Sequence, residues 1–365
     1  MLIDIIAGAR PNFMKIAPII RAIEEAKDAG GPLRYRLIHT GQHYDKKMSG
    51  DFFEQLGIPE PDINLEVGSG TQAAQAGAIM ARYEEVLLKE PSKLCLVVGD
   101  VTSTMACSIA AQKLCIPVAH VEAGIRSGDW TMPEEINRMV TDSITNWFFT
   151  TSEHANENLR TAGVSEDRIF FVGNTMIDTL LANLDRLRPP ALWNELGLEK
   201  GRYLVLTLHR PNNVDEQDKL LAMLKTIADG RRDCQVVFPV HPRTAKMLKD
   251  IGGELDGLHY AEPLGYLEFN YLVRNALAVI TDSGGITEET TVMGIPCLTL
   301  RDNTERPETV SVGTNELIGT DPTKLPPALD RLFAGEWKAG GIPELWDGKT
   351  GRRIVAQLER LLPNE

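Results

Sequence analysis

A pair of glycines between a strand-like and a helix-like segment has the residue types of a phosphate site. The apolar run at 276–280 (ALAVI) predicts a buried parallel strand, and Gly284 and Gly285 follow it where a helix-like segment begins. Glycines at such a turn let backbone N–H groups approach an anion, and a helix N-terminus adds partial positive charge. Glu289 lies about one turn into this helix, where a carboxylate can contact ribose hydroxyls. The alternative is a glycine-rich turn before an ordinary solvated helix.

Three carboxylates follow predicted strands in the first half of the chain. Asp100 comes two residues after an apolar run, Glu122 directly closes the next run, and Glu134 begins the helix-like segment after that. A carboxylate that ends an apolar strand needs a partner or a function, and three at one sheet edge favour proton transfer. An N-cap is the alternative for Asp100, and helix capping is the alternative for Glu134 or its neighbour Glu135.

Positive groups also follow predicted strands. Arg10 and Lys15 come after the first strand of the chain, and an arginine offers a planar fork to phosphate. His209 and His241 follow the first two strands of the second half, each with an arginine close behind, and Arg306 lies in an acid- and arginine-rich loop. The alternative for each histidine taken alone is a capping or satisfied interior role. Together they predict an anion-binding second half.

Alternating strand-like and helix-like segments must position these residues. The expected strands are 2–7, 35–40, 94–98, 117–121, 147–150 and 169–172, then 203–207, 234–240, 258–261, 276–280 and 296–300, with a weaker one near 316–319. Repeated βαβ units predict parallel, doubly wound sheets of the α/β class. The proline- and glycine-containing stretch at 186–201 separates two Rossmann-like halves. We expect the two halves to face a central cleft, because ligands bind at the carboxyl ends of such strands.

Composition indicates which classes of partner and which compartment to expect. The 365 residues carry a net charge of −13, which disfavours a nucleic-acid partner. Five cysteines sit singly in apolar runs, so we expect reduced thiols in a cytoplasmic protein and no metal site. The N-terminal segment predicts a strand and not a signal peptide, and no apolar run is long enough to predict a membrane span.

The chain resembles the non-hydrolysing UDP-N-acetylglucosamine 2-epimerases in a set of motifs that occur in family order. The motifs are GARPNFMK (8–15), HTGQHYD (39–45), GDVTSTMA (99–106), HVEAGIRSGD (120–129), PEEINR (133–138), GNTMIDTL (173–180), LHRPNN (208–213), PVHPR (239–243), TDSGGITEE (281–289) and RDNTERPE (301–308). They span nearly the whole chain and are highly specific as a set.

The resemblance implies a GT-B-like fold and an activity. The first domain would comprise residues 1–180 together with 350–365, because the C-terminal helix packs back on it. A linker at 181–199 would join it to a UDP-binding domain at 200–349. Members of the family reversibly invert the carbon that bears the acetamido group, by anti elimination of UDP and its re-addition. No cofactor and no metal would be needed. The implied partners are a UDP-sugar and a second copy of the chain, in a homodimer without nucleic acid or membrane.

The resemblance also assigns roles to single residues. Asp100, Glu122 and Glu134 would be the acid/base residues, with His209 close to the diphosphate. The substrate or UDP contacts would come from Arg10, Lys15, His241, Ser283, Gly284, Gly285, Glu289 (on the ribose) and Arg306.

Two departures affect the choice of substrate. The segment WTM (130–132) is shorter than in many bacterial members, as it is in relatives that act on a diacetamido uronic acid sugar nucleotide, whereas TERPE (304–308) resembles the N-acetylglucosamine enzymes. UDP-N-acetylglucosamine is therefore the expected substrate. The alternatives are a 2-epimerase of UDP-2,3-diacetamido-2,3-dideoxyglucuronate, a hydrolysing variant that releases N-acetylmannosamine, a GT-B glycosyltransferase, and a non-catalytic nucleotide-sugar binder.

Overall fold

The computed structural model describes residues 1–41, 55–240, 242–251 and 255–362. The chain divides into two compact units, one formed by Met1–Ala182 with Glu344–Glu365 and the other by Asn183–Pro343. Each unit is an α/β structure with its own parallel sheet, which confirms the predicted fold class. In the described part of the chain, no helix combines the length and the apolar character that crossing a bilayer requires.

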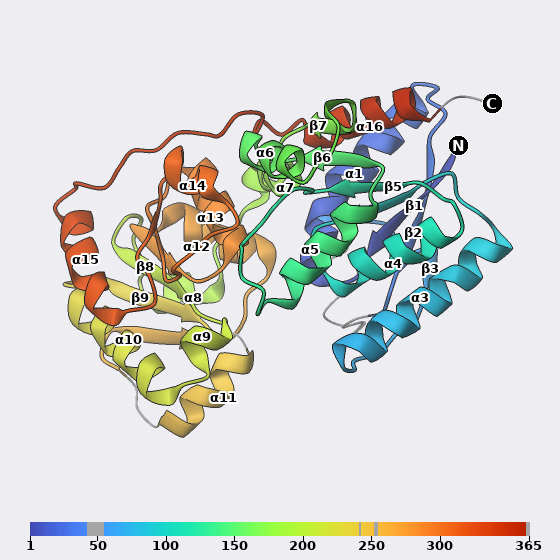
Figure 1. The fold of residues 1–365 in the computed structure, drawn as a ribbon. Coiled ribbons are helices and arrows are strands. Elements are labelled where there is room, and N and C mark those ends of the chain that lie inside the picture. Colours follow the sequence, from blue (N-terminus) through green and yellow to red (C-terminus); the bar gives the residue numbers. More distant parts are fainter. Residues whose placement is uncertain (42–54, 241, 252–254, 363–365) are drawn as a thin grey trace. The chain divides into compact units, whose positions relative to one another are not determined.

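The first unit is built on a seven-stranded sheet of order β3-β2-β1-β4-β5-β6-β7 (Figure 1). Its strands are β1 (Leu2–Ala7), β2 (Arg34–His39), β3 (Ile63–Asn64), β4 (Cys95–Val98), β5 (Val118–Val121), β6 (Trp147–Thr150) and β7 (Ile169–Phe171). Its helices are α1 (Arg10–Asp28), α3 (Gln72–Lys89), α4 (Thr102–Lys113), α5 (Pro133–Ile144), α6 (Glu153–Thr161), α7 (Thr175–Asn183) and α16 (Thr350–Leu361). The central strands β4 and β5 are buried along their whole length, as apolar strands of a parallel sheet covered on both faces should be.

Helix α16 packs against α1 within this unit (Figure 1). The backbone of Gly351 approaches Pro18 so closely that a Cβ would lie 2.4 Å from the Pro18 carbonyl oxygen. The Gly351 N–H also donates to Asp178 Oδ2 at 2.8 Å. A glycine is therefore required where the last helix meets the first.

The second unit repeats the arrangement with a six-stranded sheet of order β10-β9-β8-β11-β12-β13. Its strands are β8 (Tyr203–Thr207), β9 (Gln235–Pro239), β10 (Leu258–Ala261), β11 (Ala278–Thr281), β12 (Cys297–Thr299) and β13 (Asn315–Leu317). Its helices are α8 (Ala191–Glu195), α9 (Pro211–Val214), α10 (Gln217–Gly230), α11 (Pro242–Ile251), α12 (Tyr266–Asn275), α13 (Gly284–Met293), α14 (Pro307–Ser311) and α15 (Leu325–Phe333). Both sheets reverse their strand order at one point, between β1 and β4 and between β8 and β11, and such switch points are where open α/β sheets bind ligands.

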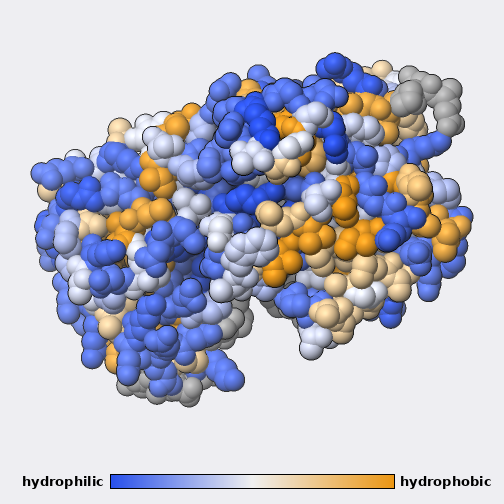
Figure 2. All heavy atoms as spheres, in the orientation of Figure 1, coloured by the Kyte–Doolittle hydropathy of each residue, from blue (hydrophilic) through white to orange (hydrophobic). Residues whose placement is uncertain are grey.

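Hydrophobic surface covers part of the first unit over α4 and α5 (Figure 2). Three large apolar side chains of this region are exposed: Trp130, Ile136 and Met139. The exposed pair on α5, Ile136 and Met139, is three residues apart and so shares one helix face.

Candidate functional site

Glu122 lies at the carboxyl edge of the first sheet in a constrained backbone conformation. It directly follows β5 and has φ +70°, a left-handed conformation that costs a residue with a side chain about 1–2 kcal/mol. Its carboxylate is 3% exposed and accepts from Lys15 Nζ at 2.5 Å, while Lys15 is 14% exposed. Gly99, which follows β4, makes room for this pair, because a Cβ there would lie 3.2 Å from Lys15 Nζ. The lysine cation so close to Glu122 favours its ionised, proton-accepting form.

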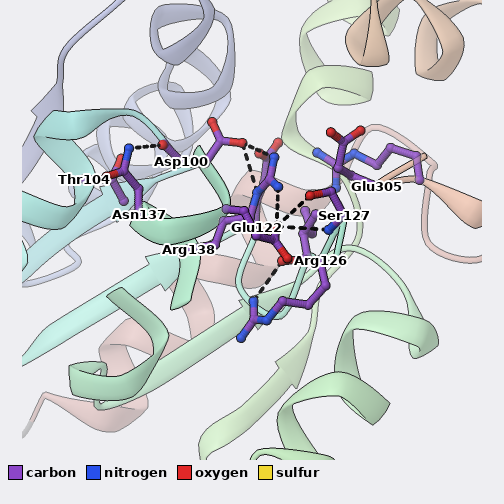
Figure 3. Close-up of polar contacts among 12 residues, drawn as sticks. Asp100, Thr104, Glu122, Arg126, Ser127, Asn137, Arg138 and Glu305 are labelled. Carbon is purple, nitrogen blue, oxygen red and sulfur yellow. Dashed lines mark hydrogen bonds and ion pairs between the residues drawn. The ribbon is translucent and has the colours of Figure 1, made fainter. Parts of the chain in front are cut away.

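Asp100 follows β4 and is held by helix α5 (Figure 3). Arg138 contacts Asp100 Oδ2 through Nη2 at 2.5 Å and through Nε at 3.1 Å. Asn137 Nδ2 donates to the Asp100 carbonyl oxygen at 2.8 Å. The Asp100 side chain keeps 29% of its surface exposed, so it is both oriented and accessible to a ligand.

The two adjacent glutamates of α5 have different surroundings. Glu135 is buried, accepts from the Ser127 and Gly128 N–H groups at 3.0 Å each, and pairs with Arg138 Nη1 at 2.7 Å. Burial opposes its ionisation, but these hydrogen bonds outweigh it and lower the pKa of Glu135. Glu135 therefore anchors the loop before α5 and orients Arg138. Glu134, half-buried, faces a pocket instead.

This pocket of about 340 Å³ lies where α3, α4 and α5 begin. It is lined by Ser69, Gly70, Gln72, Gln75, Val101, Thr102, Pro133, Glu134 and Asn137. Three helix N-termini and several amide and hydroxyl groups make it suited to a polar ligand. Asn137 lines the pocket and also donates to the Asp100 backbone carbonyl, so one side chain contacts both the pocket and the residue that carries the carboxylate.

In the second unit, Asp282 connects the two strands at the switch point. It is fully buried after β11 and accepts from the backbone N–H groups of His209 and Arg210, at 3.1 and 2.9 Å. His209 Nδ1 lies 2.8 Å from its other oxygen, and Asn213 Nδ2 donates at 3.1 Å. Burial alone would raise the pKa of Asp282, but His209 and these donors lower it. Asp282 thus holds His209 and Arg210 beside the start of α13.

The glycine pair starts α13 and lies next to a cluster of charges. A Cβ on Gly284 would lie 3.8 Å from Glu305 Oε2 and 3.9 Å from Arg301 Nη1. Arg301 forms a two-pronged pair with Glu305 at 2.7 and 2.8 Å, and Arg210 Nε donates to the Asp282 carbonyl at 3.0 Å. Burial and the nearby Arg301 lower the pKa of Arg210. Two arginines beside a helix N-terminus form an arrangement suited to a phosphate.

The two glutamates inside α13 are both buried, but only Glu288 has a cationic partner among the contacts described here. Glu288 pairs with Arg306 Nε at 2.7 Å. Glu289, 4% exposed, faces Tyr266 and Asn270, and burial raises its pKa to about 7. Glu289 is therefore a carboxyl group that titrates near neutral pH.

The predicted site residues fall into two groups, one in each unit. Lys15, Asp100, Glu122 and Glu134 lie at the switch-point edge of the first sheet, and His209, Ser283, Gly284, Gly285, Glu289 and Arg306 lie on or beside α13 and β8. His241 is outside the described residues, and Arg10 is described only as the first residue of α1. In the part of the chain described, no group of three or more His, Cys, Asp or Glu side chains is placed to hold a metal ion.

Several functional partners were not singled out from the sequence. They are Arg138 and the pair His120 and Asp142. These three residues lie within a strand or helix pattern and carry no separate signal for their role. Arg210 was expected among the positive groups because it directly follows His209, and Arg301 belongs to the arginine-rich loop that also carries Arg306.

Two Rossmann-like sheets, with carboxylates at one switch point and a helix start suited to an anion at the other, define a GT-B-like α/β enzyme. The chain belongs to the UDP-N-acetylglucosamine 2-epimerase family, an isomerase family whose model matches residues 25–359. It is 42% identical to the UDP-N-acetylglucosamine 2-epimerase of Methanocaldococcus jannaschii, over 97% of this chain and 98% of that protein. The crystal structure of a Methanocaldococcus jannaschii UDP-GlcNAc 2-epimerase in complex with UDP-GlcNAc and UDP is similar, with a TM-score of 0.88, 41% identity and coverage of 99% of this chain and 100% of that one. The UDP-2,3-diacetamido-2,3-dideoxy-D-glucuronate 2-epimerase of Pseudomonas aeruginosa is 39% identical over 87% of this chain and 88% of its own length.

Proposed function

We propose that this protein reversibly converts UDP-N-acetylglucosamine into UDP-N-acetylmannosamine without hydrolysis, by anti elimination of UDP and its re-addition. The observation that carries the proposal is the meeting of Glu122, Lys15 and Asp100 at one sheet edge. The likeness to a protein of 41% identity with UDP-GlcNAc and UDP bound supports the choice of ligand.

The carboxylates of the first unit fit the proton transfers of this reaction. The proton on the sugar carbon that bears the acetamido group is weakly acidic, so its removal needs a well-placed base shielded from water. Glu122 is buried and cation-paired, Asp100 is oriented yet accessible, and Glu134 faces the polar pocket. We assign the acid/base work to these three residues without dividing removal and return of the proton among them.

The second unit supplies groups for the part that leaves. The diphosphate gains charge as the bond to the sugar breaks, and donors aimed at that charge lower the barrier. We assign this role to the α13 N-terminus at Ser283, Gly284 and Gly285 together with His209. Removal of one such donor lowers turnover by roughly a hundredfold or more. Glu289 is assigned to the ribose; Arg10, Lys15, His241 and Arg306 complete the proposed substrate contacts.

We also propose that the protein is a cytoplasmic homodimer. Its five cysteines are free, which suits a reducing compartment. The exposed apolar side chains Trp130, Ile136 and Met139 suit a contact with a second copy. Light scattering after gel filtration should give twice the chain mass, and Ile136→Lys should give the monomer mass; a monomeric wild type would refute the dimer.

Solvent exchange tests the activity. In deuterium oxide, the enzyme should form UDP-N-acetylmannosamine and place deuterium on the carbon that inverts, with little free UDP. The 39% identity to the Pseudomonas aeruginosa enzyme makes UDP-2,3-diacetamido-2,3-dideoxyglucuronate the second candidate, to be compared side by side. Stoichiometric UDP with free sugar would indicate the hydrolysing variant. Folded enzyme that exchanges neither substrate would refute the proposal.

A further inference from the structure

A buried histidine–aspartate pair adjoins both loops that carry Asp100 and Glu122. His120 belongs to β5 and is fully buried, and its Nδ1 lies 2.7 Å from Asp142 Oδ1 on α5. On the other side of the ring, Nε2 lies 2.8 Å from the Gly99 carbonyl oxygen, at the end of β4. The histidine thus bridges the helix α5 and the residue that precedes Asp100.

The partners of His120 determine how it is hydrogen-bonded. A carbonyl oxygen only accepts, so Nε2 must donate to Gly99. Asp142 is also an acceptor in its ionised form, and its pKa is lowered because contacts with His120 and Arg126 outweigh its burial. The ring thus faces an acceptor at each nitrogen, the Asp142 carboxylate at Nδ1 and the Gly99 carbonyl at Nε2.

The second oxygen of Asp142 binds the loop after β5. It accepts from the Gly124 N–H at 3.1 Å and from Arg126 Nη1 at 2.6 Å. Gly124 has φ +78°, two residues after Glu122 with φ +70°. One carboxylate on α5 therefore holds the Glu122 loop directly and the Asp100 loop through His120.

We propose that His120 and Asp142 are positioning residues that fix the placement of Asp100 and Glu122 relative to each other, an inference that rests on the proposed epimerase function. Gly99 has φ +71°, and its position against Lys15 depends on the direction of the carbonyl that His120 holds. Displacement of a proton-transfer group by about 1 Å can reduce rates roughly a hundredfold. Neither His120 nor Asp142 needs to touch the substrate for this role.

Two substitutions of His120 separate its contacts. In His120→Asn, the amide nitrogen matches Nδ1 and keeps the Asp142 contact but loses the Gly99 carbonyl. In His120→Gln, the amide nitrogen matches Nε2 and keeps the Gly99 contact. We expect His120→Asn to lower kcat roughly 10- to 100-fold with KM changed less than about threefold, and His120→Gln to retain more activity. His154→Asn, on an exposed residue of α6 in the same unit, is the matched control.

The pH profile distinguishes positioning from direct proton transfer. Positioning predicts a parallel drop in kcat at every pH, whereas loss of one limb of the profile in His120→Asn would make His120 an acid/base group and overturn the proposal. Unchanged kcat would overturn it too. If His120→Asn does not fold, the isosteric Asp142→Asn carries the same expectations.

Amide hydrogen exchange tests the proposal independently of turnover. We expect faster exchange in segments 99–104 and 122–126 of His120→Asn than in His154→Asn. Equal exchange would overturn the positioning role even if the enzyme were active. An inactive wild type would refute the proposed function, while the exchange comparison would still decide the role of His120.

Discussion

Replacing Glu289 with glutamine should stabilise the protein at neutral pH. Glu289 is 4% exposed and faces Tyr266 and Asn270, and burial raises its pKa from 4.5 to about 7. In the unfolded chain the same carboxyl ionises near its ordinary pKa. Between these two values the folded state holds a proton that the unfolded state has lost, so the free energy of unfolding falls as the pH rises.

The expected size follows from the two pKa values. At about 1.4 kcal/mol per pH unit, the rise to about 7 corresponds to roughly 3 kcal/mol of lost stability above pH 7, and to almost none below pH 4.5. Glutamine has no charge to bury, so Glu289→Gln should gain up to about this amount at pH 8 and little at pH 5. In a unit of this size the gain corresponds to a Tm increase of roughly 5–10 °C.

Unfolding at pH 5 and pH 8, followed by tryptophan fluorescence, measures this difference. Glu288→Gln is the matched control on the same helix, because Glu288 pairs with Arg306 at 2.7 Å and its loss should destabilise the protein at both pH values. A gain in Glu289→Gln that is equal at pH 5 and pH 8, or a loss at pH 8, would refute the reasoning. If the carboxylate contacts the ribose, the same variant should bind UDP about tenfold more weakly. It would then gain stability and lose binding, as is common when a binding-site residue is replaced.

Three further predictions concern the charges of the site. Asp100→Asn and Glu122→Gln should each abolish turnover while UDP affinity, measured by calorimetry, stays within about threefold, since most of the proposed UDP contacts, those on and beside α13, are in the other unit; a large loss of affinity in both would contradict this. Lys15→Met removes the cation 2.5 Å from Glu122, so the acidic limb of the pH–rate profile should move to higher pH and kcat should fall; an unmoved limb would argue against Glu122 as the base. Asp282→Asn weakens the hydrogen bonds that hold His209 and Arg210, so UDP affinity should drop about tenfold. The pKa of Asp282 is lowered in the folded protein. Its ionised carboxylate therefore stabilises the fold above the ordinary pKa of 3.8, and this stabilisation is lost as the pH falls. A wild-type affinity in Asp282→Asn would separate these residues from nucleotide binding.

Much of the fold could be predicted because strands buried on both faces appear as short apolar runs. The strand expected at 2–7 is β1, and the strand expected at 203–207 is β8. Strand β3 was not predicted, because two residues at the edge of a sheet are too short to form a pattern. The expected linker at 181–199 contains α8, a five-residue helix whose Trp193 packs edge-on against Tyr203 and Tyr271.

The placement of the site could be predicted, but its ion pairs could not. Polar residues that follow parallel strands gather at one edge, so Asp100 and Glu122 were found from position alone. Their partners depend on packing: Lys15 is 107 residues from Glu122 and Arg138 is 38 residues from Asp100. Lys15 was expected near this edge from its position after the first strand, but the sequence does not show that it pairs with Glu122, and Arg138 has no feature that distinguishes it from a solvated helix cation.

The carboxylates assigned to proton transfer and the carboxylate assigned to the ribose have different partners. Lys15 pairs with Glu122 and Arg138 pairs with Asp100, so both of these carboxylates assigned to proton transfer have a cation as partner. Glu289 faces an amide and a phenol instead, and its pKa of about 7 makes it the group whose charge changes near neutrality. Under the proposed assignment, moderate acidification therefore changes the charge of the nucleotide contact at Glu289. A cationic partner would lower the pKa of Glu289, so its neutral neighbours Tyr266 and Asn270 are what allow its charge to change near neutral pH.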